Sequence, residues 1–101
     1  MANCEECASS RKAQQSEKEK KELITRLNRI EGQIRGITKM INEDVYCNDI
    51  LNQITSVKAA ITSTQSLLLK KHINSCVVSQ IKEGQLGVID ELIATIERIK
   101  K

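Results

Sequence analysis

Apolar side chains recur at alternating spacings of four and three residues through the first half of the chain, at Leu23, Leu27, Ile30, Ile34, Ile37 and Ile41. This spacing places them in one stripe along an α-helix, of the kind that suits coiled-coil-like packing. Ser16 and Glu19 match the capping-box pattern that opens a helix. The sequence therefore predicts a first helix that begins near Ser16 and ends before a polar break at residues 42–44.

A second helix is predicted after this break. Asp44 is a plausible N-cap, which makes Cys47 the third residue of the helix. The chain contains no proline, so the helix can run to about Lys82, a length of roughly 57 Å at about 1.5 Å per residue. Gly84 and Gly87 then mark a turn.

The last segment predicts a third helix from about Val88 to the end, with its apolar residues on one side. The expected fold class is therefore all-α, a three-helix antiparallel bundle with a long central helix. The 101 residues include one Tyr and no Phe or Trp, so the core must be aliphatic. Contacts between subunits stabilise such a chain better than its own core does, and we expect a dimer or a dimer of dimers, that is, a homotetramer.

Residues 1–18 are polar and without period, and we interpret them as a flexible tail before a domain that spans residues 19–101. Cys4 and Cys7 in this tail form a CxxC pair that could chelate a soft metal, accept Cu(I) from a copper chaperone, form a redox disulfide, or do none of these. No segment has the apolar length of a membrane span or signal peptide, so we expect a cytoplasmic protein without a membrane partner.

Three further residues have the chemistry of a metal site. His72 and Cys76 are four apart and share one helical face. Cys47 cannot join them within one chain, because 25 residues of helix correspond to roughly 37 Å. An antiparallel second chain would bring its own Cys47 beside them, and a two-fold axis near Ala59 and Ala60 would create two identical Cys-His-Cys sites.

Two thiolates and an imidazole are soft donors that select Cu(I) or Zn(II) over Mg(II) and Ca(II). Three donors without a fourth favour Cu(I), because structural zinc sites nearly always have four protein ligands. The alternative from spacing alone is that each cysteine is a small core residue and His72 a hydrogen-bonded one.

From about Lys21 to its end, the chain closely resembles the copper-sensitive operon repressor (CsoR) family in the stretches RLNRIEGQIRGI, DVYCNDILNQI, LLLKKHINSC and IDELI. The resemblance implies a dimeric or tetrameric three-helix repressor with a trigonal Cu(I) site across the dimer interface. Its ligands would be Cys47 of one chain with His72 and Cys76 of the other. Tyr46 and Glu91 match outer positions that link the metal to the DNA-binding surface.

The same resemblance separates the branches of the family. Nickel and cobalt sensors place a histidine where Cys76 stands, formaldehyde sensors lose the later cysteine, and persulfide sensors tend to lack the histidine. We therefore expect a Cu(I)-responsive repressor whose metal-free form binds operator DNA and whose Cu(I) form releases it. One alternative is a persulfide sensor using Cys47 and the partner's Cys76. Another is a copper-storage or structural protein without DNA binding, and no residues suggest an enzyme.

Evidence for DNA binding lies mainly in the first helix. The net charge is only +3, but the basic residues gather in the N-terminal third. Most of those in the first helix fall on the side away from the apolar stripe, which by itself is usual for a solvated face. With the family resemblance, we expect a phosphate-binding surface made by Arg26, Arg29, Arg35 and, on the second helix, Lys58.

Overall fold

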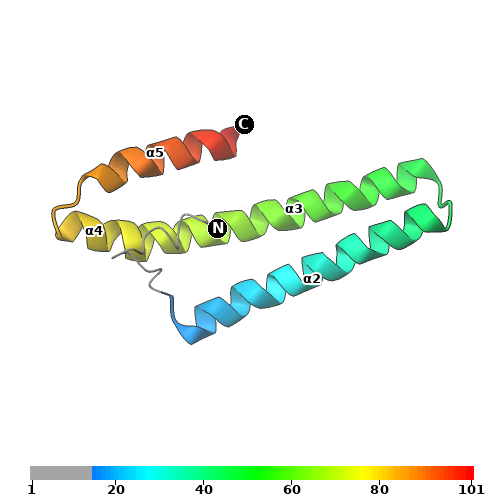
Figure 1. Ribbon diagram of the computed structural model, residues 1–101, viewed down its shortest axis with the longest axis horizontal. Coiled ribbons are helices and arrows are strands. Elements are labelled where there is room, and N and C mark those ends of the chain that lie inside the picture. The colour runs from blue at the N-terminus through cyan, green and yellow to red at the C-terminus, as the bar shows by residue number, and fades with distance from the viewer. Residues whose placement is uncertain (1–14) are drawn as a thin grey trace. The chain divides into compact units, whose positions relative to one another are not determined.

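A computed structural model describes residues 15–101, which contain helices and no strand. The elements are α2 (Glu17–Asn42), α3 (Cys47–His72), the π-helix η1 (Ile73–Val77), α4 (Val78–Lys82) and α5 (Gly87–Lys100). Figure 1 labels the α-helices. Since α3, η1 and α4 follow one another without a break, the described chain has three helical segments, the middle one longest. The predicted all-α class is confirmed, and no described helix is long and apolar enough to cross a membrane. Cys4 and Cys7 lie outside the described residues.

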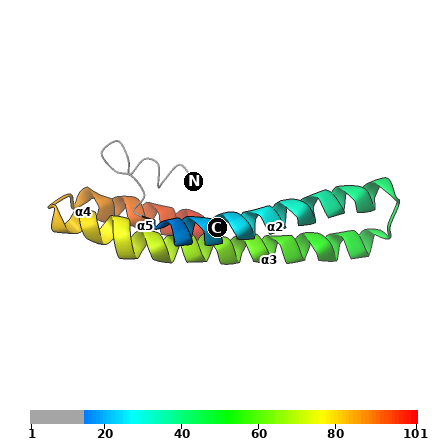
Figure 2. The ribbon, with the colours of Figure 1, turned by 90° about the horizontal axis from the view of Figure 1, so that it is seen from below.

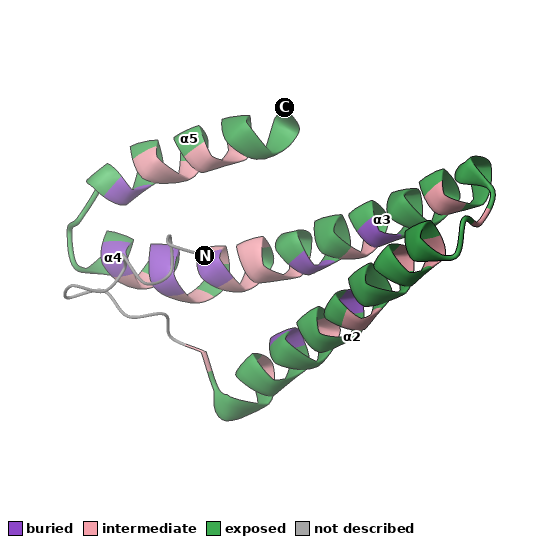
Figure 3. Ribbon diagram, turned by 45° about the vertical axis from the view of Figure 1, so that its right-hand side comes forward, coloured by how far each residue is buried: buried purple, intermediate pink, exposed green. Residues whose placement is uncertain are grey.

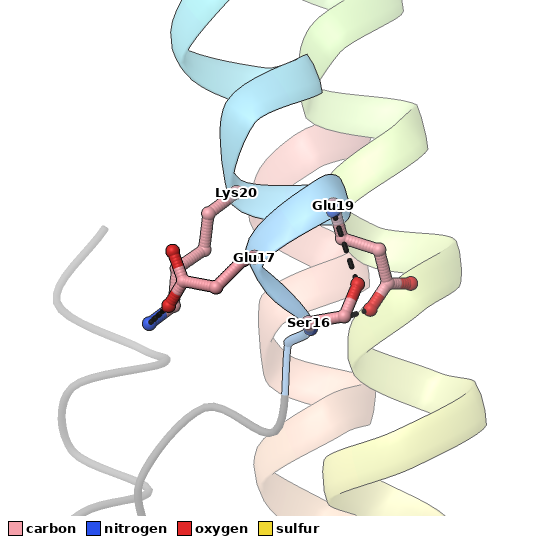
Figure 4. A network of polar contacts seen from close by, with 4 residues as sticks. All are labelled: Ser16, Glu17, Glu19 and Lys20. Carbon is pink, nitrogen blue, oxygen red and sulfur yellow. Dashed lines mark hydrogen bonds and ion pairs between the residues drawn. The ribbon is translucent and has the colours of Figure 1, made fainter.

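The first helix begins where the sequence predicts, with a reciprocal capping box (Figure 4). The backbone N–H of Glu19 donates to Ser16 Oγ at 3.1 Å, and the backbone N–H of Ser16 donates to Glu19 Oε1 at 2.9 Å. These bonds satisfy two backbone donors that a helix start otherwise leaves without partners. Glu17 and Lys18, which we expected in the tail, are therefore part of α2.

Helices α2 and α3 form an antiparallel hairpin joined by residues 43–46 (Figures 1 and 2). The predicted N-cap at Asp44 is wrong. Its φ of 56° lies in the left-handed region, whereas an N-cap residue is extended, so Asp44 belongs to the turn. The carbonyl of Tyr46 accepts from the N–H of Asp49 at 3.0 Å, and Cys47 is the first residue of α3 instead of the third.

The described chain divides into two compact units, residues 16–68 and 69–101. In the first unit, Leu23 and Ile30 of the predicted stripe are buried, together with Val57 of α3. Leu27, Ile34 and Ile41 of the same stripe remain exposed. Figure 3 shows that most of α2 is exposed, with short buried stretches. The two-helix hairpin therefore covers only part of the apolar surface that its sequence provides.

The second unit contains the end of α3, η1, α4 and α5, with a core that includes Cys76, Val77 and Val88. A turn at Gly84, with φ of 80°, separates α4 from α5 as predicted. Gly87 does not belong to this turn, because it is the first residue of α5. The long helical run ends at Lys82 as predicted. It is not α-helical throughout, because at η1 the hydrogen bonds span five residues instead of four.

Candidate metal centre and basic surface

His72 and Cys76 lie on the same helical run and are both buried. His72 is the last residue of α3 and is 8% exposed, and Cys76 lies in η1 and is 3% exposed. The wider π turn between them still places residues four apart on successive turns of one face. The structure thus provides a nitrogen donor and a sulfur donor in one buried place.

The π turn that carries Cys76 has a local partner in Ser75. The Ser75 hydroxyl donates to the carbonyl oxygen of Lys71 at 2.7 Å. Ser75 Oγ also lies 4.0 Å from Cys76 Sγ. A serine that bonds the carbonyl four residues back competes with the regular helical ladder and can bend a helix. Since π turns occur frequently at functional sites, the irregular helix supports a special role for this segment.

Cys47 differs from Cys76 in its surroundings. It is an exposed free thiol at the start of α3, next to Tyr46, which is 73% exposed. Along α3, 25 residues separate Cys47 from His72. Within residues 15–101, no three His, Cys, Asp or Glu side chains gather where they could hold a metal ion. One chain therefore offers a buried two-donor pair and a separate exposed thiol.

The two residues expected outside the ligand shell lie in different units. Glu91 is half-buried on α5, the helix that contacts η1, so it belongs to the same unit as His72 and Cys76. Tyr46 precedes α3 in the other unit. The linking role expected for Tyr46 and Glu91 stays a prediction.

The arginines assigned to DNA have different environments. Arg26 is half-buried, and its Nη1 donates to Ser63 Oγ on α3 in a long hydrogen bond of 3.5 Å. Arg35 is exposed, with its Nη1 3.4 Å from Glu31 Oε1. Arg29 and Lys58 are also exposed. An open depression on α2 is lined by Lys18, Lys21, Glu22, Thr25, Arg26 and Arg29.

Comparison with known proteins identifies the family. The profile of a family described as metal-sensitive transcriptional repressors matches residues 19–98. The chain belongs to this family. The family consists of repressors, which agrees with the expectation that the chain is not an enzyme. The sequence resemblance to copper-sensing repressors of the CsoR type is confirmed as well.

Several members of the family are similar over most of their length. The copper-sensing repressor CsoR of Bacillus subtilis (strain 168) is 44% identical over 87 residues, which cover 85% of this chain and 86% of that protein. The copper-sensing repressor RicR of Mycobacterium tuberculosis (strain ATCC 25618 / H37Rv) is 44% identical over 77 residues, with coverages of 73% and 80%.

Two solved structures share the fold. The copper-sensing repressor CsoR with Cu(I) from Geobacillus thermodenitrificans NG80-2 has a TM-score of 0.82 and 39% identity, and the match covers 86% of this chain and 92% of that one. The nickel-responsive regulator InrS has a TM-score of 0.69 and 33% identity, with coverages of 85% and 94%. Because these relatives respond to different metals, the donor atoms must decide which metal suits this member of the family.

Proposed function

We propose that this chain is a Cu(I)-responsive transcriptional repressor whose metal-free oligomer binds operator DNA. Cys47 of one subunit, with His72 and Cys76 of its partner, would hold the metal and make DNA binding weaker. By linkage, DNA must lower the affinity for Cu(I) by the same factor. The observation that carries the proposal is the separation of one exposed thiol from a buried His-Cys pair by 25 residues of helix.

The donor set supports Cu(I) over the other metals of the family. Two sulfurs and one imidazole nitrogen are soft, and Cu(I) accepts such ligands. Burial of His72 and Cys76 keeps water from competing at the pair, and when bound, Cu(I) would link two subunits through all three donors.

DNA binding is supported by the family and by the exposed bases of α2. Arg29 and Arg35 stand on the exposed side of the helix, where phosphates could reach them. Arg26 is half-buried and already bonds Ser63, so it would position the hairpin as well as contact phosphate. Each phosphate that is neutralised steepens the dependence of binding on salt.

The deciding experiment is an anaerobic titration of the reduced protein with Cu(I) while DNA binding is followed by fluorescence anisotropy. The probe is a labelled duplex from directly upstream of the gene. We expect release to be complete at one Cu(I) per chain, with X-ray absorption showing two sulfurs and one nitrogen. DNA binding that Cu(I) does not change, or a centre without nitrogen, would contradict the proposal.

The exposed thiol of Cys47 supports one alternative, a repressor that senses persulfide. A Cys47 thiolate could attack the sulfane sulfur of a hydropersulfide RSSH, form Cys47–SSH and release the thiol RSH. The partner's Cys76 thiolate would then displace HS⁻ from Cys47–SSH and leave a disulfide between the subunits. This chemistry does not need His72, which is therefore the residue that separates the two hypotheses.

A further inference from the structure

Helix α2 contains two interior glycines, Gly32 and Gly36, whose presence the chain itself does not explain. Glycine is among the residues least favourable inside a helix. A Cβ atom added at Gly36 would meet nothing within 4 Å, and one at Gly32 would meet only Arg35 Nη2 at 3.8 Å, an ordinary contact. Neither glycine has a positive φ. Alanine would fit both positions, so packing within the described chain does not require glycine at either one.

Basic side chains flank the two glycines on one helix face. At about 100° per residue around the helix axis, Gly32 and Gly36 are about 40° apart. Lys39 lies about 20° beyond Gly32 on one side, and Arg29 lies about 20° beyond Gly36 on the other. Lys21 has the same angular position as Lys39, because 18 residues make about five turns. The depression toward the helix start shares Lys21 and Arg29 with this face, and its other lining residues are Lys18, Thr25, Arg26 and one acidic residue, Glu22.

The cations of this face are available for an outside partner. Within residues 15–101, Lys21, Arg29 and Lys39 make no ion pair, whereas Arg35 pairs with Glu31 and Lys20 with Glu17. A second copy of the same face would bring like charges together. A polyanion complements the positive charge of this face. The lack of side chains at Gly32 and Gly36 favours only a polyanion that approaches the helix backbone closely.

We propose that the sugar-phosphate backbone of duplex DNA packs directly against α2 at Gly32 and Gly36, while Lys21, Arg29 and Lys39 contact flanking phosphates. The inference rests on the proposed repressor function and adds to it. The closest contact between DNA and the helix would then lie at two residues without charge. The centre of the DNA surface would lie away from Arg26, which bonds Ser63, and from Arg35, which pairs with Glu31. A methyl group at Gly36 would hold the duplex away from the helix.

The test compares Gly36→Ala, Gly36→Leu and Gly32→Ala with the wild type and with Gly87→Ala. The control removes a glycine that also has open space around it but lies on α5. Binding is measured with the labelled upstream duplex and with a random-sequence duplex of equal length. We expect Gly36→Ala to weaken both by about five- to tenfold, comparable with the loss of one phosphate contact, and Gly36→Leu to weaken them more.

Thermal unfolding and Cu(I) binding are measured on the same samples. The alanine variants of α2 should unfold at or above the wild-type temperature, because alanine favours the helix, so weaker DNA binding cannot come from loss of fold. Cu(I) affinity without DNA should stay at the wild-type value in the α2 variants, and the DNA and Cu(I) affinities of Gly87→Ala should also stay at the wild-type values. Unchanged DNA affinity in Gly36→Ala and Gly36→Leu would overturn the inference. An oligomer smaller than that of the wild type in either variant would overturn it as well. A wild-type protein that binds neither duplex would instead refute the repressor function.

Discussion

His72 and Cys47, which the sequence predicts as ligands of one metal site, differ in how far the fold buries them. His72 is buried beside Cys76, where replacing the ring removes a donor and opens space, whereas Cys47 is exposed and can be changed without disturbing the packing. At this scale the sequence predicted the identity of the candidate donors from residue type and spacing. It could not predict their burial, which depends on the packing of α5 on η1.

A change of His72 to Ala should separate copper sensing from sulfur sensing. The variant should still bind the upstream duplex, since His72 lies outside the basic face, but Cu(I) should release it poorly because the nitrogen donor is gone. Release is followed by anisotropy with Cu(I) and, separately, with a hydropersulfide. Normal release by Cu(I) would remove His72 from the metal centre, and release by the hydropersulfide alone would support the rival.

Arg29→Ala should weaken DNA binding through charge alone. If the guanidinium contacts one phosphate, the slope of log affinity against log salt should fall by about one unit. The matched control is Arg98→Ala, which removes the same charge from α5, where Arg98 bonds Thr95. If both variants lose DNA affinity and salt dependence equally, net charge explains the effect and Arg29 does not contact a phosphate.

At the scale of elements, the sequence predicted helix starts and turns where a single residue dominates the local energy. Ser16 with Glu19 defined the start of α2, and Gly84 defined the turn before α5. Asp44 misled because aspartate favours both N-caps and left-handed turn positions, and only the hairpin geometry selects between them. Ser75 could not have predicted the π turn, because Thr38, Thr55 and Thr64 make the same bond to the carbonyl four residues back within regular α-helix.

The two glycines near α5 give a matched test of turn energetics. Gly84→Ala should lower the free energy of unfolding by about 1 kcal/mol, because alanine is strained at positive φ. Gly87→Ala should change it by less than about 0.5 kcal/mol or stabilise the protein, because its φ suits any residue. Urea unfolding of both variants provides the comparison. Equal losses would mean that the strain at Gly84 does not control the turn.

At the scale of the whole molecule, apolar surface is more abundant than the described residues of one chain can cover. Exposed side chains include Leu27, Ile34 and Ile41 on α2 and Leu51, Ile54 and Ile61 on α3. The sequence predicted this excess from its long aliphatic stripes and few aromatic residues. It could not say which positions stay uncovered, because that depends on how the two helices of the hairpin pair.

Association should therefore govern stability. If subunits cover these residues, the midpoint of thermal unfolding should rise with protein concentration, because association acts by mass action on the folded state. Calorimetry over a hundredfold range of concentration, with sedimentation at each end, tests this expectation. A midpoint that does not depend on concentration, in a sedimenting monomer, would show that one chain is stable with its apolar residues exposed.

The length of α3 also has a genetic consequence, because each proposed centre takes residues from two molecules. In a mixture of Cys47→Ser and His72→Ala chains, a mixed dimer would have one centre that lacks both residues and one that is intact. With random pairing, about one centre per four chains would be restored, although neither variant forms any alone. Cells that produce both variants should regain copper-dependent derepression through complementation between subunits. A mixture that binds no more Cu(I) than its separate parts would place all donors within one chain.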